Sequence, residues 1–184
     1  SLDAALGLKA SPANGWWFNL TGGYQIRTND MAWMIREGYV GYYTGFVYGK
    51  AKVAYGSIEL KYDYKDLFDL ALKGTYYSWK MDEVMDQGWS DEFLMSLKPE
   101  LEMNAEVGFK PIEGLRVNVG YEYVKRASDM YDPINNLYAG ADYALLKNLS
   151  VFAKVNNLLN KEYVRHDGYP AQKLNLLAGV SIQF

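Results

Sequence analysis

Residues 174–184 read LNLLAGVSIQF, and this stretch decides the fold class. Its apolar side chains recur at every second position, on Leu174, Leu176, Ala178, Val180, Ile182 and Phe184. Polar or small residues occupy the positions between them, with Leu177 as the one apolar exception. Because successive side chains of a β-strand point to opposite faces, this alternation predicts a strand with an apolar and a polar face.

The same alternation recurs along the chain and predicts about nine strands of the length that a tilted transmembrane strand needs. These strands cover residues 2–8, 16–24, 57–64, 67–79, 101–109, 115–123, 137–143, 149–155 and 174–184. Residues 39–48 also alternate and are a candidate for a tenth strand. Short turns are expected at residues 10–15, 64–67, 110–114 and 145–148, and long loops at residues 27–45, 81–98, 127–134 and 158–172.

The composition excludes several kinds of site. The 184 residues include no cysteine, which excludes disulfides, thiolate metal sites and cysteine nucleophiles. No stretch approaches the roughly 20 apolar residues that a transmembrane helix needs. A net charge of -3 without a run of lysine or arginine makes nucleic acid a poor partner. The 17 tyrosines and 5 tryptophans must therefore pack in a core, lie at a lipid boundary or contact a ligand.

The alternation fits two architectures. In a soluble sandwich or small barrel the apolar face is the core, whereas in a membrane barrel it meets lipid and the polar face lines the lumen. Small residues on the apolar face and the terminal Phe184 favour the membrane barrel. Aromatic residues at the strand ends also favour it, as lipid-boundary girdles: Trp16, Trp17, Tyr24, Tyr62, Tyr64, Phe68, Tyr76, Tyr77, Trp79, Phe109, Tyr121 and Tyr123. We therefore expect residues 1–184 to form a single segment of an antiparallel up-and-down transmembrane β-barrel.

A second signal lies in the last two predicted strands and the loop between them. Residues 149–163 read LSVFAKVNNLLNKEY, and residues 168–172 read GYPAQ. Together with the closing strand, they resemble the C-terminal end of TonB-dependent outer-membrane receptors, most of all those of Bacteroidetes-type bacteria. The residues that carry this resemblance are Asn156, Asn157, Leu158, Asn160, Lys161, Tyr163, Gly168, Tyr169, Pro170, Gly179 and Phe184. Residues 1–148 resemble the family only in the style of their hairpins.

The resemblance implies a function in the outer membrane of a Gram-negative cell. Members import a scarce nutrient, such as an iron chelate, cobalamin or a glycan, through a barrel of about 22 strands. They are not enzymes, and no cofactor is implied. The implied partners are outer-membrane lipid, the barrel-assembly machinery, TonB through an N-terminal part, and a surface lipoprotein.

The chain departs from the family in length. It has no plug domain, no TonB-contact segment, and no signal peptide at residues 1–6, and it is too short for the whole barrel. We therefore expect a C-terminal piece of a longer receptor. Two alternatives stay open: a complete small outer-membrane barrel with a structural or adhesion role, and a soluble β-barrel that binds an apolar ligand.

Physical chemistry explains parts of the motif. The side chains of Asn156, Asn157 and Asn160 are expected to hydrogen-bond the backbone where the strand ends and the loop begins. Tyr163 is expected to place an amphipathic ring at the outer lipid boundary. Phe184 completes a strand that must find a partner strand, because an open sheet edge cannot face lipid.

Two long loops carry the candidate ligand contacts. Aromatic rings beside arginine can stack on a sugar, haem-like or chelate ligand, although extended strand ends above the bilayer would use the same residues. His166 is the only histidine, and a solvated loop residue is the simpler interpretation for it. The candidates are Trp33, Arg36, Tyr39, Tyr42, Tyr43, His166 and Tyr169.

Charged residues on the polar faces are expected to pair with one another inside a lumen. They are Glu102, Glu106, Glu122, Asp142, Lys73, Lys110, Arg116 and Lys154. A carboxylate pair of the glycosidase kind is the less favoured interpretation. The acidic loop at residues 81–98 lacks the spacing of a calcium-binding loop and is expected to be solvated, so the sequence predicts neither an enzyme nor a metal site.

Overall fold

The computed structural model describes all residues except 39–40, 85–94, 97, 167 and 184, and the side chains of residues 29, 31–38, 41–48 and 83–84 are also outside the description. The described chain forms one nine-stranded antiparallel sheet with the order β1-β2-β3-β4-β5-β6-β7-β8-β11. The strands are β1 (Leu2–Ala10), β2 (Trp16–Gly38), β3 (Gly41–Tyr64), β4 (Phe68–Val84), β5 (Pro99–Ile112), β6 (Leu115–Arg126), β7 (Ile134–Leu146), β8 (Leu149–Asn156) and β11 (Asn175–Ile182). A separate small hairpin pairs β9 (Val164–His166) with β10 (Tyr169–Pro170).

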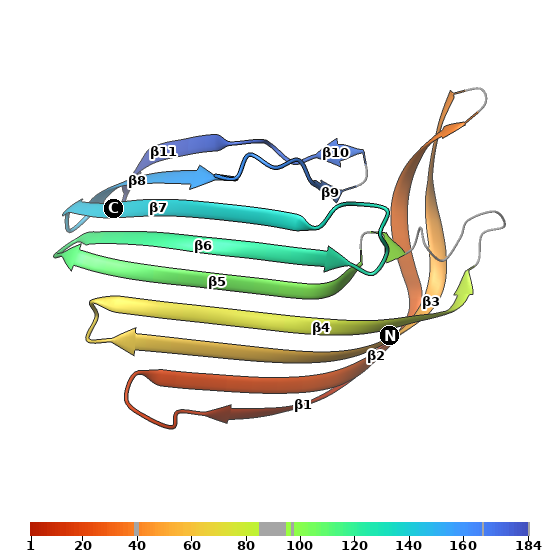
Figure 1. Ribbon diagram of the computed structural model, residues 1–184, viewed down its shortest axis with the longest axis horizontal. Helices are drawn as coiled ribbons and strands as arrows, with labels where there is room; N and C mark the ends of the chain where they lie inside the picture. Colours follow the sequence, from red (N-terminus) through yellow and green to blue (C-terminus); the bar gives the residue numbers. More distant parts are fainter. Residues whose placement is uncertain (39–40, 85–94, 97, 167, 184) are drawn as a thin grey trace.

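Strands that follow one another in the sequence lie side by side in the sheet, which curves without closing (Figure 1). The strands β1 and β11 form its two edges. This confirms the all-β, antiparallel up-and-down arrangement, and the number of strands in the sheet agrees with the sequence prediction.

The strand register joins the apolar positions into one continuous face. Phe18 is opposite Leu60, Leu60 is opposite Leu72, and the row continues through Ala105 to Tyr121. Residues paired across a sheet point to the same face, so every strand contributes to this surface.

This apolar face is exposed. Leu6 is 86% exposed and Leu176 is 71% exposed. In the described chain no second sheet covers it. A soluble sandwich would bury such a face, whereas a membrane barrel presents it to lipid.

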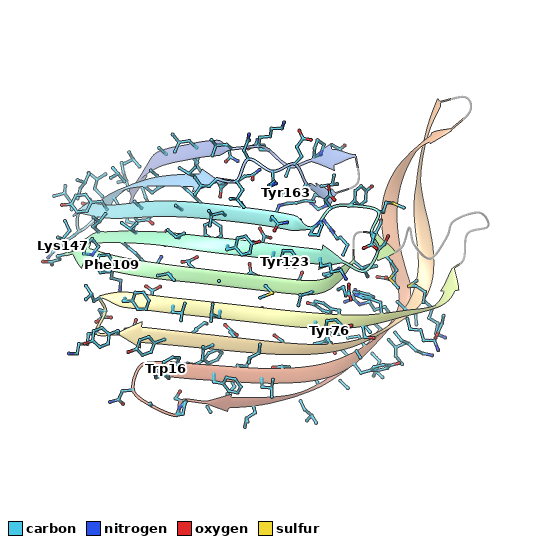
Figure 2. The ribbon with its side chains drawn as sticks, viewed as in Figure 1. Trp16, Tyr76, Phe109, Tyr123, Lys147 and Tyr163 are labelled. Carbon is cyan, nitrogen blue, oxygen red and sulfur yellow. The ribbon has the colours of Figure 1, made fainter. Side chains whose placement is uncertain are left out.

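Aromatic side chains frame the apolar face near both rims. Figure 2 shows Trp16 and Phe109 toward the rim with the short turns, and Tyr76 and Tyr123 toward the opposite rim. Trp16, Phe109 and Tyr76 are all exposed. Such belts are typical of strands that cross the two lipid boundaries.

Tight turns connect the strands at one rim, as the sequence predicted. The turn between β1 and β2 depends on Gly15, whose φ is 79° and whose carbonyl accepts a hydrogen bond from the Asp63 N–H at 2.8 Å. A Cβ atom on Gly15 would lie 2.1 Å from the Asp63 carbonyl oxygen. Both the backbone conformation and the close approach therefore require glycine at this position.

We expect Gly15→Ala to lower the free energy of unfolding by about 2 kcal/mol, because it adds left-handed strain and a backbone clash. Gly56→Ala is the matched control, since nothing lies within 4 Å of the added Cβ atom and its φ is ordinary. Urea unfolding of the full-length protein in lipid vesicles measures both. Equal effects of the two substitutions would contradict this account of the turn.

The predicted loop at residues 27–45 is wrong. β2 continues to Gly38 and β3 starts at Gly41, and the two strands pair from the Asp30–Gly49 pair up to their tip. Residues 41–48 therefore begin β3 and form no separate tenth strand. Register irregularities at Arg27/Asp30 and Lys50/Ala51 accompany the bend with which this hairpin leaves the sheet in Figure 1.

Candidate functional site

A network of charges and hydroxyls covers the polar face over β4 to β8. The Arg116 Nη2 atom lies 2.8 Å from Asp69 Oδ2 and 3.2 Å from Glu106 Oε1. The Tyr138 hydroxyl donates to Glu106 at 3.0 Å, and Lys154 Nζ lies 5.3 Å from the centre of the Tyr138 ring. The predicted pairing of Arg116 with a polar-face carboxylate is therefore confirmed. One guanidinium therefore bridges two carboxylates on neighbouring strands, as in a structural network.

The other predicted polar-face charges have different surroundings. Glu102 accepts a hydrogen bond from Tyr77 at 3.0 Å, and Asn136 donates to Glu122 at 3.2 Å. Lys73 and Asp142 lie on the polar face by register. These contacts place the predicted charges along a polar wall without concentrating them at one reactive centre.

A cluster of cations and one tryptophan lies where the β2–β3 hairpin leaves the sheet. The Arg27 guanidinium lies 5.1 Å and the Lys98 ammonium 5.3 Å from the centre of the Trp79 ring. The buried Asp30 pairs with both cations, at 3.8 Å from Arg27 Nη1 and in close contact with Lys98. The Trp79 indole donates to the Pro99 carbonyl at 2.7 Å. The cluster therefore ties the segment around Lys98, just before β5, to the base of the β2–β3 hairpin.

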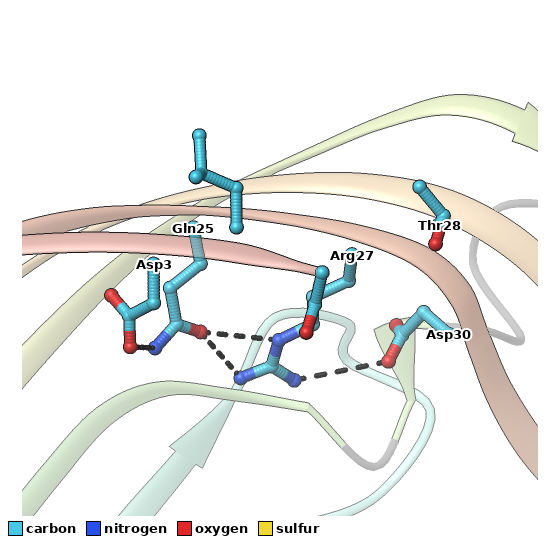
Figure 3. A pocket seen from close by; sticks show the side chains of 7 residues that line it. Asp3, Gln25, Arg27, Thr28 and Asp30 are labelled. Atoms are coloured by element: carbon cyan, nitrogen blue, oxygen red, sulfur yellow. Dashed lines mark hydrogen bonds and ion pairs between the residues drawn. The ribbon is translucent and has the colours of Figure 1, made fainter.

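A pocket of about 420 Å³ lies beside this cluster, between β1 and β2 (Figure 3). Its side chains form a chain of contacts, in which Gln25 donates to Asp3 at 2.9 Å and Arg27 donates to Gln25 Oε1 at 2.7 and 3.1 Å. The charged side chains of this pocket are therefore largely hydrogen-bonded or ion-paired with other groups of the protein.

A neighbouring groove of about 380 Å³ extends over β2, β3 and β4 on the polar face. Its lining includes hydroxyl, amide and tyrosine side chains: Asn19, Thr21, Gln25, Arg27, Tyr55, Ser57, Glu59, Lys73, Thr75 and Tyr77. The ring centres of Tyr55 and Tyr77 are 6.3 Å apart, and those of Tyr77 and Trp79 are 6.2 Å apart. This row of rings and hydrogen-bonding groups can stack on and hydrogen-bond a small ligand.

The assignment of every strand-end aromatic to a lipid girdle is wrong at three positions. Trp17, Tyr77 and Trp79 lie on the polar face, where Lys61 Nζ is 4.8 Å from the Trp17 ring and Tyr77 bonds Glu102. Strand parity carries the missing signal, because positions 77 and 79 alternate in step with the polar positions 73 and 75.

The loop between β8 and β11 is organised by Asn157, which is only 1% exposed. Its Nδ2 atom donates to the carbonyls of Lys161 at 2.8 Å and Gln172 at 3.2 Å, and its Oδ1 atom accepts from the Lys161 N–H at 3.0 Å. Asn160 accepts from the Leu174 N–H at 3.1 Å. The backbone hydrogen bonds predicted for Asn157 and Asn160 are thus present.

Other motif residues differ from the prediction or extend it. Asn156 donates to the side chain of Asn175 at 3.2 Å instead of bonding the backbone. The N–H of Leu158 donates to the Leu137 carbonyl at 2.8 Å, which ties the start of the loop to β7. Asn157 and Asn160 both have positive φ, at 52° and 50°, a region that asparagine tolerates better than most residues. Their place in the motif therefore has a conformational reason.

The predicted place of Tyr163 at the lipid boundary is wrong, because its side chain is 6% exposed. The loop folds back over the polar face, and Arg126 donates to the Val164 carbonyl at 2.6 Å. Arg165 donates to both oxygens of Glu122, at 2.9 and 2.5 Å, and lies 5.5 Å from the Tyr163 ring. The hydrogen bonds to Glu122 raise the pKa of Arg165 above its ordinary value. Arg165 therefore fastens the loop to β6 as a permanent cation.

We expect Arg165→Ala to increase amide hydrogen exchange at residues 163–171 severalfold, because the bidentate ion pair with Glu122 is lost. Hydrogen exchange of the full-length protein followed by mass spectrometry measures this. Lys173→Ala is the control, since its ion pair with Glu162 is exposed on both sides and surface pairs contribute little. An unchanged exchange rate in Arg165→Ala would show that the ion pair does not hold the loop.

The predicted ligand contacts lie on two separate hairpins. In β2 and β3, Arg36 is opposite Tyr43 and Glu37 is opposite Tyr42, while Trp33 is opposite Phe46. Their side chains, and Tyr39 altogether, lie outside the described residues. In the small hairpin His166 is opposite Tyr169, which is 66% exposed, and Gly168 has a φ of 74°.

The described residues contain neither a metal-binding cluster nor a helix that could span a membrane. No group of three or more histidine, cysteine, aspartate or glutamate side chains there is arranged to hold a metal ion. No helix in the described part of the chain is long and apolar enough to cross a membrane.

No protein-family model matches this sequence. No curated protein matches it either.

Solved structures of TonB-dependent receptors do match its fold. The copper transporter OprC aligns at a TM-score of 0.69 with 15% identity, covering 99% of this chain and 30% of that one. The ferric-catecholate import receptor Fiu of Escherichia coli K12 aligns at 0.68 with 17% identity, covering 99% and 27%. The ferric enterobactin receptor PfeA of Pseudomonas aeruginosa aligns at 0.64 with 17% identity, covering 99% and 31%.

This chain therefore spans about a third or less of each of these receptors. Its nine-stranded sheet has the fold of the barrel wall of TonB-dependent receptors.

Proposed function

We propose that this chain is the C-terminal part of the barrel wall of a TonB-dependent outer-membrane receptor that imports a scarce nutrient. The observation that carries the proposal is the sheet itself, whose exposed apolar face and charged polar face match the two surfaces of such a wall. Its fold likeness to the import receptors over 99% of its length supports the same conclusion.

Each face has a defined role in this proposal. The apolar face meets lipid through side chains such as Leu176, Val180 and Ile182. The polar face lines the lumen, where the Arg116 network and the folded loop around Asn157 keep the wall rigid. A plug and a TonB-contact segment outside this chain supply gating and energy coupling.

The partners follow from this placement. Lipid covers the apolar face, and the barrel-assembly machinery reads the last strand. A surface lipoprotein covers the rim that carries the long loops. The GYPAQ segment at residues 168–172 supports an origin in Bacteroidetes-type bacteria.

The test is an uptake assay in the native bacterium. Strains lacking this gene, or lacking TonB, are supplied in turn with ferric chelates, cobalamin and glycans as the sole source of iron, cobalamin or carbon. We expect growth on one nutrient to be lost in both strains and restored by the full-length gene. Normal uptake of all of them in the gene deletion, or uptake that persists without TonB, would overturn the proposal.

Fractionation provides an independent measurement. The full-length protein is expected in the outer-membrane fraction and to require detergent for extraction, because its apolar face is exposed. A monodisperse protein that stays in solution without detergent would contradict a membrane location.

A further inference from the structure

Three aromatic rings on the polar face lie across glycines of the neighbouring strand. A Cβ atom on Gly23 would lie 2.4 Å from Tyr55 Cζ, and one on Gly120 would lie 2.1 Å from Tyr138 Cζ. A Cβ atom on Gly179 would lie 2.7 Å from Phe152 Cζ. Each ring therefore occupies the space that a side chain would take, and it covers the backbone of the sheet.

The surroundings of Tyr55 and Tyr138 differ. Lys154 lies over the Tyr138 ring and the Tyr138 hydroxyl is bonded to Glu106, so that ring is already used by the protein. Tyr55 instead borders the 380 Å³ groove and is half-buried, with the tilted Tyr77 ring beside it. An aromatic surface at the edge of a groove is a platform on which a ligand ring can stack.

Neutral hydrogen-bonding groups surround this platform. Thr21, Ser57 and Thr75 contribute hydroxyls, and Asn19 contributes an amide whose oxygen accepts from the Thr21 hydroxyl at 3.4 Å. The Thr75 hydroxyl donates to Ser57 Oγ at 3.1 Å, which leaves the Ser57 hydroxyl proton for another acceptor. Groups that both donate and accept match the hydroxyls of a sugar, which also do both.

The charges at the groove are mostly neutralised by other parts of the protein. Arg27 is bonded to Gln25 and paired with Asp30, and Glu59 lies 3.0 Å from Lys61 Nζ. Lys73 adds one exposed ammonium group, which can donate to a ligand hydroxyl. An anionic chelate would be bound best by cations free to pair with it, so the groove favours a neutral ligand.

We propose that the groove over β2, β3 and β4 is a subsite for one neutral sugar ring of an oligosaccharide, stacked on Tyr55 and hydrogen-bonded by Thr21 and Ser57. The subsite rests on the proposed function, because the polar face must line a lumen for a nutrient to reach it. Its volume of about 380 Å³ lies within the range of small-ligand sites.

The experiment measures binding to the full-length protein in detergent by isothermal titration calorimetry. The probes are maltohexaose, cellohexaose and xylohexaose, with ferric citrate as an anionic comparison. At least one hexasaccharide is expected to bind. Tyr55→Ala is expected to weaken that binding about tenfold, which corresponds to about 1.4 kcal/mol, while Tyr55→Phe stays within about twofold because the ring remains.

Tyr138→Ala is the matched control, since it removes another tyrosine that lies across a glycine but has its ring occupied by Lys154. Its binding is expected to equal that of the parent protein. Equal losses in Tyr55→Ala and Tyr138→Ala would assign both rings to the structure of the wall and overturn the subsite.

Two further outcomes separate the subsite from the proposed function. TonB-dependent uptake of ferric citrate or cobalamin by a protein that binds none of the three hexasaccharides overturns the subsite and leaves the receptor proposal standing.

The second outcome concerns the alternative that another part of the same protein, and not a sugar, occupies the groove. The cysteine in Tyr55→Cys is expected to react with a hydrophilic maleimide in the ligand-free protein, and protection from the reagent would overturn the subsite.

Discussion

Ala105→Arg is expected to lower the free energy of unfolding in lipid vesicles by about 2–4 kcal/mol. Ala105 lies in the middle of β5 on the apolar face, between Leu72 and Tyr121, and between the levels of the belt residues Phe109 and Tyr123. A guanidinium at this depth must be transferred from water into hydrocarbon, and contacts with apolar neighbours do not offset the free energy that this transfer costs. Urea unfolding of the full-length protein measures the change, with this variant and its control, Asn104→Arg, in the same vesicles.

The preceding residue provides the control. Asn104 precedes Ala105 in β5 but lies on the polar face, opposite Lys73 and Glu122. Asn104→Arg is expected to change the free energy of unfolding by less than about 1 kcal/mol, because substitutions on the lumen side remain in contact with water. If the two arginines cost the same, the assignment of the two faces to lipid and lumen is wrong.

Asn157→Ala is expected to cost about 3 kcal/mol or more of the free energy of unfolding. It removes three hydrogen bonds and leaves two carbonyls and one N–H without their partner in a buried loop. Alanine also tolerates the left-handed backbone at φ 52° less well than asparagine does. The same unfolding experiment measures the loss, and hydrogen exchange at residues 158–174 shows whether the loop opens.

Asn156 supplies the comparison for this prediction. It is the preceding asparagine of the same motif, and its side-chain amide donates to the Asn175 side chain at 3.2 Å. Asn156→Ala is expected to cost about 1 kcal/mol or less, since a single half-exposed hydrogen bond contributes little. A cost in Asn156→Ala as large as that in Asn157→Ala would contradict the central role of Asn157.

Local signals were sufficient for much of the fold. Alternation at every second residue reports which face a side chain shares with its neighbours, and it does so within one strand. The faces of Leu60, Leu72 and Tyr121 were therefore predictable without knowledge of the strand pairing. The same holds for Asn157 and Asn160, whose short side chains bond the backbone close by in the sequence.

The β2–β3 hairpin could not be predicted in the same way. The register irregularities at Arg27/Asp30 and Lys50/Ala51 interrupt the alternation in both strands. The alternation at residues 39–48 was therefore visible, but its continuity with the strand predicted at residues 57–64 was not. A bulge adds a residue to one strand and changes which positions lie on the polar face beyond it. Only the pairing of the two strands shows that the hairpin continues.

Burial of Tyr163 also depended on the tertiary structure. The sequence places a tyrosine shortly after a strand end, which is the usual position of a lipid-boundary ring. The loop instead folds inward because Arg165 donates to Glu122 and Arg126 donates to the Val164 carbonyl. Glu122 lies more than 40 residues before Arg165 in the chain. No local pattern contains that contact.

The sequence by itself determined the strands, their two faces, the short turns and the asparagines that shape the last loop, because each depends on residues close together in the chain. The tertiary structure decided the Trp79 cluster and the groove beside Tyr55. The groove needs side chains from β2, β3 and β4 in one register, and the Trp79 cluster needs Lys98 beside β2 and β4. Tyr55 can cover the backbone only because Gly23 lies opposite it on the next strand. Register is a property of paired strands, and it was therefore not readable from any one of them.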